Sequence, residues 1–290
     1  MKAIYDIPAP AKLNLFLHIT GRRADGYHLL QSVFMLIDWC DTLHVELRAD
    51  GQISRCDVGA DSDVVLPEND LTVRAAKALQ QACGTPLGVH ISLEKRIPSQ
   101  AGLGGGSSDA ASCLLALQRL WGITLPRHEL LALALQLGAD VPFFLSGGHA
   151  WVEGVGELIT PITLPSADFL VVKPPQGLST PAIFSSPALK RDSETATLLG
   201  FAANTPAQIF RFGHNDLQPV AQELCPQIAQ SIDWLSAQQL QGRMTGSGSA
   251  VFAHLPQDAS GHVNVDLSVH PDGWKVRKCS NLQAHPLSDW

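Results

Sequence analysis

A glycine-rich loop is the stretch of this chain best suited to hold an anion. Residues 98–108 read PSQAGLGGGSS, and four of the residues between 102 and 106 are glycines. Glycine lacks a side chain, so the backbone N–H groups of such a loop can closely approach a phosphate. An apolar helix is predicted over residues 109–120, and the positive end of its dipole would face the same anion. Because a flexible linker does not usually join a strand to an apolar helix, the loop predicts a phosphate-binding site.

Two well-known phosphate-binding motifs do not fit this loop. A Walker A motif ends in Gly-Lys-Ser or Gly-Lys-Thr, whereas Gly106 is followed by Ser107. A dinucleotide-binding motif that starts at Gly102 requires glycine or alanine where Ser107 stands, and no regular series of βαβ units accompanies it. The loop therefore belongs to neither class.

A lysine and an asparagine share one face of a predicted strand near the N-terminus. Apolar residues at 13, 15, 17 and 19 alternate with other side chains, a pattern that predicts a strand over residues 12–20 with one buried face. Lys12 and Asn14 are two residues apart and so point the same way. The lysine is either a group that stabilises phosphate charge or a solvated surface cation.

A single carboxylate lies in the otherwise apolar run GADVPFF, residues 138–144. Buried acids are seldom kept without a partner or a task, so Asp140 is a candidate catalytic group. It also suits the N-cap of a helix that starts at Val141, with Pro142 in the first turn. The two interpretations are compatible. A second glycine cluster, TGSGS at residues 245–249, indicates by itself no more than a tight turn between a helix and a strand.

Strands and helices are mixed along the chain, which favours an α+β fold. Residues 33–37, 41–47, 89–93, 169–172, 250–254 and 274–278 are predicted strands. Helices are predicted from Asp70 to Gly84 and over residues 109–120, 129–137, 217–230 and 231–240. The pattern changes near Leu164, so we expect two domains, residues 1–164 and 165–290.

The composition is that of a folded globular protein. Of the 290 residues, 45% are hydrophobic and 16% are charged, and the net charge of −7 argues against binding to a nucleic-acid backbone. No apolar run is long enough to cross a membrane, and the first 12 residues lack the features of a secretory signal. We therefore expect a cytoplasmic protein. Six widely spaced cysteines suggest neither a zinc site nor a disulfide framework.

Five motifs together resemble the GHMP kinase superfamily, which includes galactokinase, homoserine kinase and mevalonate kinase. They are PAKLNL at residues 10–15, GRRADGYH at 21–28, the glycine loop, GADVPFF at 138–144 and MTGSG at 244–248. The resemblance implies a ribosomal-protein-S5-like N-terminal domain with the ATP site and a ferredoxin-like C-terminal domain. The active site would lie between them. The Asp-Gly-Tyr-His block after Gly-Arg-Arg is similar to that of members which phosphorylate a cytidine diphosphate alcohol for isoprenoid synthesis.

The resemblance also implies roles for individual residues. Asp140 would be the catalytic base, Lys12 its charge partner and Asn14 a group that orients the substrate. The cytidine side of the substrate would meet Tyr27, His28, Thr180 and Phe184, with the aromatic rings of Tyr27 and Phe184 stacked on the base. ATP would contact Asn69, Leu71, Lys95, Gly102, Leu103, Gly104, Gly105, Gly106, Ser107 and Ser108. Mg²⁺ is expected as well, with no protein ligand assigned; Ser107 or water would complete its coordination shell.

Two other functions remain open at this point. The first is another small-molecule kinase of the superfamily, such as a mevalonate-type or homoserine kinase. Tyr27 and His28 argue against it, because its substrate carries no base for them to contact. A catalytically silent nucleotide sensor would keep the glycine loop but could lose Lys12 or Asp140, and both are present. The expected partners are ATP and a small-molecule substrate, with no nucleic acid or membrane, and the chain is expected to be a monomer or a homodimer.

Overall fold

A six-stranded sheet forms the first part of the protein. The computed structural model describes residues 2–59, 66–256 and 270–290. The strands are β1 (Ala3–Arg22), β2 (His28–Arg48), β3 (Ile53–Asp57), β4 (Gly88–Glu94), β5 (Ala150–Glu153) and β6 (Leu158–Pro161). Their order is β3-β4-β2-β5-β6, with β1 also paired to β2. Only β3 and β4 are parallel; the other pairs are antiparallel.

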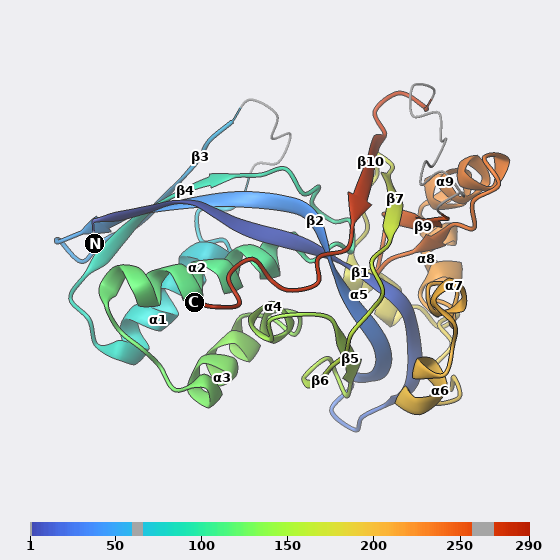
Figure 1. Ribbon diagram of the computed structural model, residues 1–290, viewed down its shortest axis with the longest axis horizontal. Helices are drawn as coiled ribbons and strands as arrows, with labels where there is room; N and C mark the ends of the chain where they lie inside the picture. The colour runs from blue at the N-terminus through green and yellow to red at the C-terminus, as the bar shows by residue number, and fades with distance from the viewer. Residues whose placement is uncertain (1, 60–65, 257–269) are drawn as a thin grey trace.

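Four helices cover one face of this sheet (Figure 1). They are α1 (Leu71–Cys83), α2 (Gly105–Trp121), α3 (Arg127–Leu137) and α4 (Val141–Leu145). The local sequence fixes both ends of α1: the Asp70 carboxylate accepts from the backbone N–H of Val73, and Gly84 ends the helix in the left-handed conformation. The predicted boundaries of this helix are therefore confirmed.

The second part of the protein is built on a four-stranded antiparallel sheet. Its strands are β7 (Asp168–Lys173), β8 (Arg243–Met244), β9 (Val251–Leu255) and β10 (Lys275–Ser280), in the order β10-β7-β9-β8. The helices of this part are α5 (Thr180–Ser185), α6 (Leu198–Ala202), α7 (Pro206–Ile209), α8 (Gln218–Leu224) and α9 (Pro226–Ala237). The mixed content confirms the α+β fold class, and none of the helices in the described ranges is long and apolar enough to cross a membrane.

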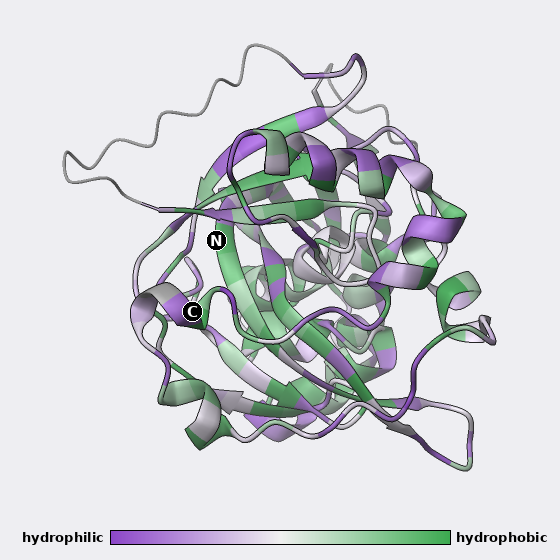
Figure 2. Cartoon of the chain, turned by 90° about the vertical axis from the view of Figure 1, so that its right-hand side faces the viewer, coloured by the Kyte–Doolittle hydropathy of each residue, from purple (hydrophilic) through white to green (hydrophobic). Residues whose placement is uncertain are grey.

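The long strands β1 and β2 are buried on both faces. Phe34 and Leu36 of β2 pack with the helices α1 to α4, whereas the alternate residues Val33 and Met35 pack with the second sheet, including Phe169. In Figure 2 the strands in the middle of the molecule are largely coloured as hydrophobic. The prediction of one buried face for residues 12–20 is therefore wrong. The polar face with Lys12 and Asn14 does not meet water but lies on the side of the helical layer, where Phe34 and Leu103 of the glycine loop contact Lys12.

Several predicted elements have different boundaries in the structure. The two strands predicted over residues 33–47 are one continuous strand, β2. Helix α2 begins at Gly105, four residues before its predicted start, because the last glycines of the loop form its first turn. The break between α8 and α9 lies at Cys225-Pro226 rather than after Gln230, since proline has no N–H group to continue the α8 hydrogen bonds.

Candidate active site

A cavity of about 1230 Å³ is lined by residues from both parts of the chain. Strand β1, the glycine loop and the segment before α4 contribute from the first part, and α5 and residues 246–248 contribute from the second. Every site residue predicted from the sequence lines this cavity except Ser108. A volume of this order is enough for a nucleotide together with a second small molecule.

Lys12, Asn14 and Asp140 form a polar cluster in the wall of the cavity. The Lys12 ammonium donates to Asn14 Oδ1 (2.5 Å) and lies 3.6 Å from Asp140 Oδ2. Lys12 is only 3% exposed, so it is not a solvated surface cation. Burial lowers the pKa of Lys12, and the Asp140 carboxylate opposes this shift. The Asn14 amide also donates to Ser32 Oγ (2.9 Å), which fixes the position of the asparagine behind the lysine.

Asp140 is placed by the turn between α3 and α4. It occupies the N-cap position of α4, but its side chain accepts no capping hydrogen bond. The carboxylate is instead directed to Lys12 and is about one-third exposed, with a side-chain exposure of 34%. The capping interpretation thus describes the position of Asp140 but not what its carboxylate contacts.

The glycine loop leads directly into the N-terminus of α2. Gly104, the N-cap residue, has φ +72°, and a Cβ atom there would lie 2.9 Å from the ring of Phe144. The N–H groups of Gly105, Gly106 and Ser107 belong to the first turn and have no partner inside the helix. The backbone N–H of Lys12 donates to Leu103 O (2.9 Å), which joins the loop to β1. The loop therefore presents free backbone donors beside the Lys12 cluster.

The second glycine cluster packs against the first. A Cβ atom on Gly102 would lie 2.3 Å from Thr245 O, and one on Gly246 would lie 2.8 Å from Gly102 O. The N–H of Ser249 donates to Gln100 O, and the hydroxyl of Thr245 accepts from the N–H of Asn14 (2.9 Å). The cluster at residues 245–249 is therefore part of the site and not only a turn. By itself the sequence of this cluster indicates only a turn, because the contact joins residues more than 140 positions apart; the cluster is nonetheless one of the five motifs of the resemblance.

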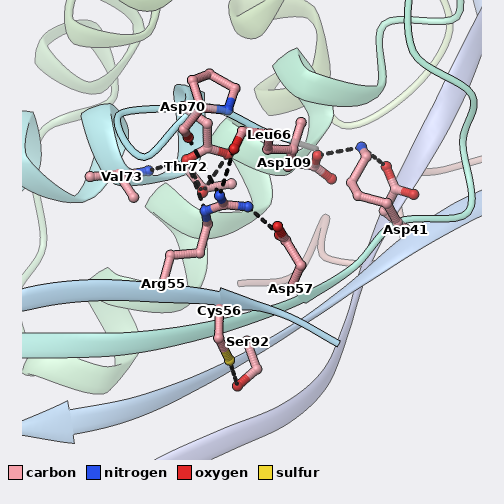
Figure 3. A network of polar contacts seen from close by, with 12 residues as sticks. Asp41, Arg55, Cys56, Asp57, Leu66, Asp70, Thr72, Val73, Ser92 and Asp109 are labelled. Carbon is pink, nitrogen blue, oxygen red and sulfur yellow. Dashed lines mark hydrogen bonds and ion pairs between the residues drawn. The ribbon is translucent and has the colours of Figure 1, made fainter. Parts of the chain in front are cut away.

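Lys95 lies between two buried carboxylates. Its ammonium donates to Asp41 Oδ2 and to Asp109 Oδ2 (2.7 Å), and Asp41 Oδ1 accepts from the backbone N–H groups of Arg96 and Ile97. Burial opposes the charge of Lys95, but Asp109 and Asp41 outweigh it and raise the pKa of the lysine. Burial, together with Asp41, raises the pKa of Asp109 well above its ordinary value. Figure 3 shows the two aspartates on either side of this contact.

The residues predicted to contact ATP differ in whether they line the cavity. Leu71 lines the cavity at the start of α1, and Asn69 is exposed beside it, accepting from the Lys77 ammonium (3.2 Å). Arg55 of β3 holds the same end of α1 through an ion pair with Asp70 (Figure 3). Ser108 lies outside the cavity: its side chain is fully buried, and its N–H donates to Gly104 O (2.9 Å). The N–H of Ser108 is therefore used within the helix, and its buried hydroxyl has no hydrogen-bond partner among the described residues.

The far end of the cavity contains the residues predicted to meet a base. His28 packs against Phe184, with ring centroids 4.9 Å apart, and Tyr27 is 64% exposed at the turn between β1 and β2. Among the described residues, Tyr27 and Phe184 make no ring contact with each other, although both line the cavity. Thr180 at the start of α5 shares a hydrogen bond with Ser247 of the second glycine cluster (2.6 Å).

Sequence reasoning missed Asp41, Asp109 and Arg191. Asp41 and Asp109 enclose Lys95, and Arg191 donates to His28. Each is separated in sequence from the residue it contacts, by 54, 14 and 163 positions respectively, so no local motif contains both partners. In the described ranges there is no group of three or more histidine, cysteine, aspartate or glutamate side chains arranged to hold a metal ion.

Two family models match this chain. The model of the GHMP kinases N terminal domain matches residues 70–148, which include the glycine loop and Asp140. The model of the GHMP kinases C terminal domain matches residues 198–261. Both parts of the structure are therefore represented, in the order expected for this family.

Relatives with curated names match over the full length of the chain. A 4-diphosphocytidyl-2-C-methyl-D-erythritol kinase from Polaromonas sp. (strain JS666) is 75% identical, with 100% of this chain and 95% of the relative covered. The kinase of the same name from Variovorax paradoxus is 60% identical, with 100% and 99% covered.

Two solved structures are similar to this chain. A crystal structure of 4-(cytidine 5'-diphospho)-2C-methyl-D-erythritol kinase has a TM-score of 0.71 and 38% identity, with 85% of this chain and 88% of that one covered. A homoserine kinase from Cytophaga hutchinsonii has a TM-score of 0.68 at 14% identity and covers 98% of this chain, which shows a shared fold.

Proposed function

The chain belongs to the GHMP kinase family, and from that premise we propose that it phosphorylates the 2-hydroxyl group of 4-diphosphocytidyl-2-C-methyl-D-erythritol. As a member of the family it is a small-molecule kinase with ATP as its phosphate donor. The choice of acceptor is supported by full-length relatives that carry the name of this substrate, and the reaction is a step of isoprenoid biosynthesis.

One observation supports the mechanism most directly: Lys12 and Asp140 lie 3.6 Å apart beside the first turn of α2. We propose that the Asp140 carboxylate accepts the proton of the 2-hydroxyl group as its oxygen forms a bond to the γ-phosphorus of ATP. The bond from that phosphorus to the bridging oxygen breaks, and ADP leaves with the electron pair. Asp140 suits this task because it is only partly buried and accepts no capping hydrogen bond.

Lys12 supplies positive charge where the transferred phosphoryl group passes. Its ammonium is almost completely buried, so its attraction for phosphate oxygens is weakly screened by water. Both polar ends of the Asn14 amide are engaged, one by Lys12 and the other by Ser32. We therefore assign Asn14 the role of holding the lysine, rather than the direct orientation of the substrate predicted from the sequence.

The first turn of α2 is the proposed site for the phosphates of ATP. Its free N–H groups, at Gly105, Gly106 and Ser107, lie at the positive end of the helix dipole, so both the hydrogen-bond donors and the dipole favour a bound anion. The Ser107 hydroxyl, which lines this region, is an oxygen donor of the kind that Mg²⁺ prefers. Held there by Ser107, Mg²⁺ would supply positive charge that neutralises the phosphates of ATP.

Tyr27, His28, Thr180 and Phe184 are the proposed site for the cytidine part of the substrate. Two aromatic side chains and a histidine at one end of the cavity suit a pyrimidine base, which needs stacking surfaces and a polar group at its edge. A mevalonate or homoserine substrate has no such base. This difference separates the proposed substrate from those of other kinases with the same fold.

The proposed function is tested by ATP consumption with four acceptors: the cytidyl diphosphate alcohol, mevalonate, homoserine and galactose. We expect ADP release with the first acceptor alone. Turnover of mevalonate or homoserine in its place would move the assignment to another branch of the family. Absence of ATP consumption with every acceptor would instead favour the nucleotide sensor.

We also propose a functional division of the chain near Leu164. The last strand of the first sheet ends at Pro161 and the first strand of the second sheet begins at Asp168, which supports this boundary. A cytoplasmic location and a monomeric or homodimeric state stay predictions.

A further inference from the structure

His28 faces the end of the cavity proposed for the base. It is the first residue of β2, and its ring packs at an angle of 36° against the ring of Phe184 in α5. Such a histidine can read the polar edge of a base, but only if the proton on its neutral ring has a fixed position. In the neutral ring, one nitrogen carries a proton and the other accepts a hydrogen bond.

Arg191 contacts His28 from the segment that follows α5. Its Nε–H group donates to His28 Nε2 at 3.0 Å. Its two terminal nitrogens donate to the backbone carbonyls of Phe184 (3.1 Å), Ser186 (2.7 Å) and Leu189 (2.8 Å). Three of its contacts therefore fix the guanidinium group in place, and the fourth reaches the histidine ring.

The direction of this hydrogen bond determines the tautomer of His28. Arginine stays protonated in proteins and can only donate, so His28 Nε2 must accept. A nitrogen that accepts a hydrogen bond carries a lone pair and no proton, so the proton of the neutral ring lies on Nδ1. Burial, followed by the positive charges of Arg191 and Arg22, lowers the pKa of His28, which favours this neutral ring.

No hydrogen bond to His28 Nδ1 is found in residues 2–59, 66–256 and 270–290, so this N–H group is free to meet a ligand. Cytosine presents an acceptor at N3, whereas uracil presents an N–H donor at the same position. An N–H donor from the protein would therefore pair with cytosine and oppose uracil. With the proton on Nε2 instead, the Nδ1 lone pair would pair with uracil.

We propose that Arg191 is a positioning residue that holds His28 with its proton on Nδ1, and that this tautomer makes the base site select cytosine over uracil. The inference rests on the proposed function, because it assigns the cytidine part of the substrate to this end of the cavity. Arg191 acts through His28 and does not itself need to touch the substrate.

The first test is the ¹⁵N NMR spectrum of the free enzyme labelled at histidine. The chain has 11 histidines, so the His28 signals are identified by their loss in His28→Gln. We expect a protonated Nδ1 and an unprotonated Nε2 in the wild type, and a mixture of both tautomers in Arg191→Met. Lys190→Met is the matched control, because it removes a neighbouring exposed cation and should leave the His28 signals unchanged.

The second test compares kcat/KM for the cytidine substrate and its uridine analogue. We expect the ratio of the two values to fall by about tenfold or more in Arg191→Met, because a mismatched hydrogen bond at a polar edge discriminates strongly. A purely structural role of Arg191 would lower both values together and leave the ratio unchanged. In the His28→Gln background, Arg191→Met should cause no further fall in the ratio, since the two residues act as a unit.

The outcomes separate this inference from the proposed function. A wild-type enzyme that does not phosphorylate the cytidine compound would overturn the proposed function. A wild-type enzyme that does so, but whose His28 carries its proton on Nε2, would overturn the role of Arg191. Retention of the wild-type tautomer and of the cytidine-to-uridine ratio in Arg191→Met would overturn it equally.

Discussion

Asp140 is the residue on which the proposed chemistry depends most. We predict that Asp140→Asn keeps the fold and lowers kcat by about 10²-fold to 10⁴-fold, because the amide cannot accept the hydroxyl proton. The substitution is nearly isosteric and the side chain caps no helix, so the loss of stability should come from the ion pair with the buried Lys12. Steady-state kinetics and circular dichroism of the variant measure the two effects. Turnover close to that of the wild type would remove Asp140 from the mechanism.

Lys173 gives a second prediction at the scale of one residue. Its ammonium is 5% exposed and donates to the carbonyls of Pro174 and Gln176, and burial lowers its pKa to about 8 from the ordinary 10.5. Between these two values the unfolded chain binds more protons than the folded one, so stability should rise with pH there. The slope is at most about 1.4 kcal/mol per pH unit.

Urea unfolding of the wild type and of Lys173→Met from pH 7.5 to 10.5 tests this prediction. The difference between the two free energies of unfolding isolates Lys173 from the other groups that titrate in this range. Curves that stay parallel across the range would contradict it.

At the scale of elements, Lys95 connects three secondary-structure elements. It directly follows β4, and its ammonium forms ion pairs with Asp41 of β2 and Asp109 of α2. Lys95→Met leaves two carboxylates buried without a cation, so we predict a loss of about 3–5 kcal/mol in the free energy of unfolding. The exposed Lys77→Met is the control and should cost less than about 0.5 kcal/mol. If Lys95→Met raised the KM for ATP but left the free energy of unfolding unchanged, Lys95 would be an ATP contact and not a structural cation.

The glycine loop allows a matched pair of substitutions. Among the described residues, a Cβ atom on Gly106 would meet only Leu71 Cδ1, at 3.5 Å, whereas one on Gly104 would meet Phe144 at 2.9 Å and the stem of Lys12 at 3.1 Å. We predict that Gly106→Ala raises the KM for ATP with little change in the melting temperature. Gly104→Ala should lower both the melting temperature and kcat, because φ is +72° and Lys12 must move.

Kinetics and thermal melts of the two variants measure these effects. A large loss of stability in Gly106→Ala would show that this glycine is required for packing rather than for the approach of a phosphate.

The elements differ in how far the sequence predicts them. Helix α1 is predictable because Asp70 and Gly84 at its ends are local signals. The burial of both faces of β1 is not predictable, because the polar face with Lys12 is covered by residues distant in sequence, Phe34 and the glycine loop. Lys12 and Asp140 were found from their types and neighbours. Asp41 and Arg191 were missed because their partners Lys95 and His28 are distant in sequence.

At the scale of the whole molecule, the C-terminal segment returns from β10 to the first part of the protein (Figure 1). The N–H of Leu282 donates to Leu36 O, and that of His285 donates to Gly147 O. Leu287 is 3% exposed and packs in the core with the helices of the first part, whereas Trp290 is 38% exposed. The segment therefore connects the end of the second sheet to the helical layer of the first.

We predict that Leu287→Ala lowers the free energy of unfolding by about 2–4 kcal/mol, the usual cost of emptying a buried leucine site. Trp290→Ala should cost about 1 kcal/mol or less, because its main contact is the exposed stacking with Arg119. Since β1 and β2 belong to the cores on both of their faces, both variants should still unfold in a single transition. Urea unfolding followed by tryptophan fluorescence and by far-UV circular dichroism should give coincident curves. Separate transitions for the two probes, or an equal cost for both substitutions, would contradict the role of the C-terminal segment in joining the two parts.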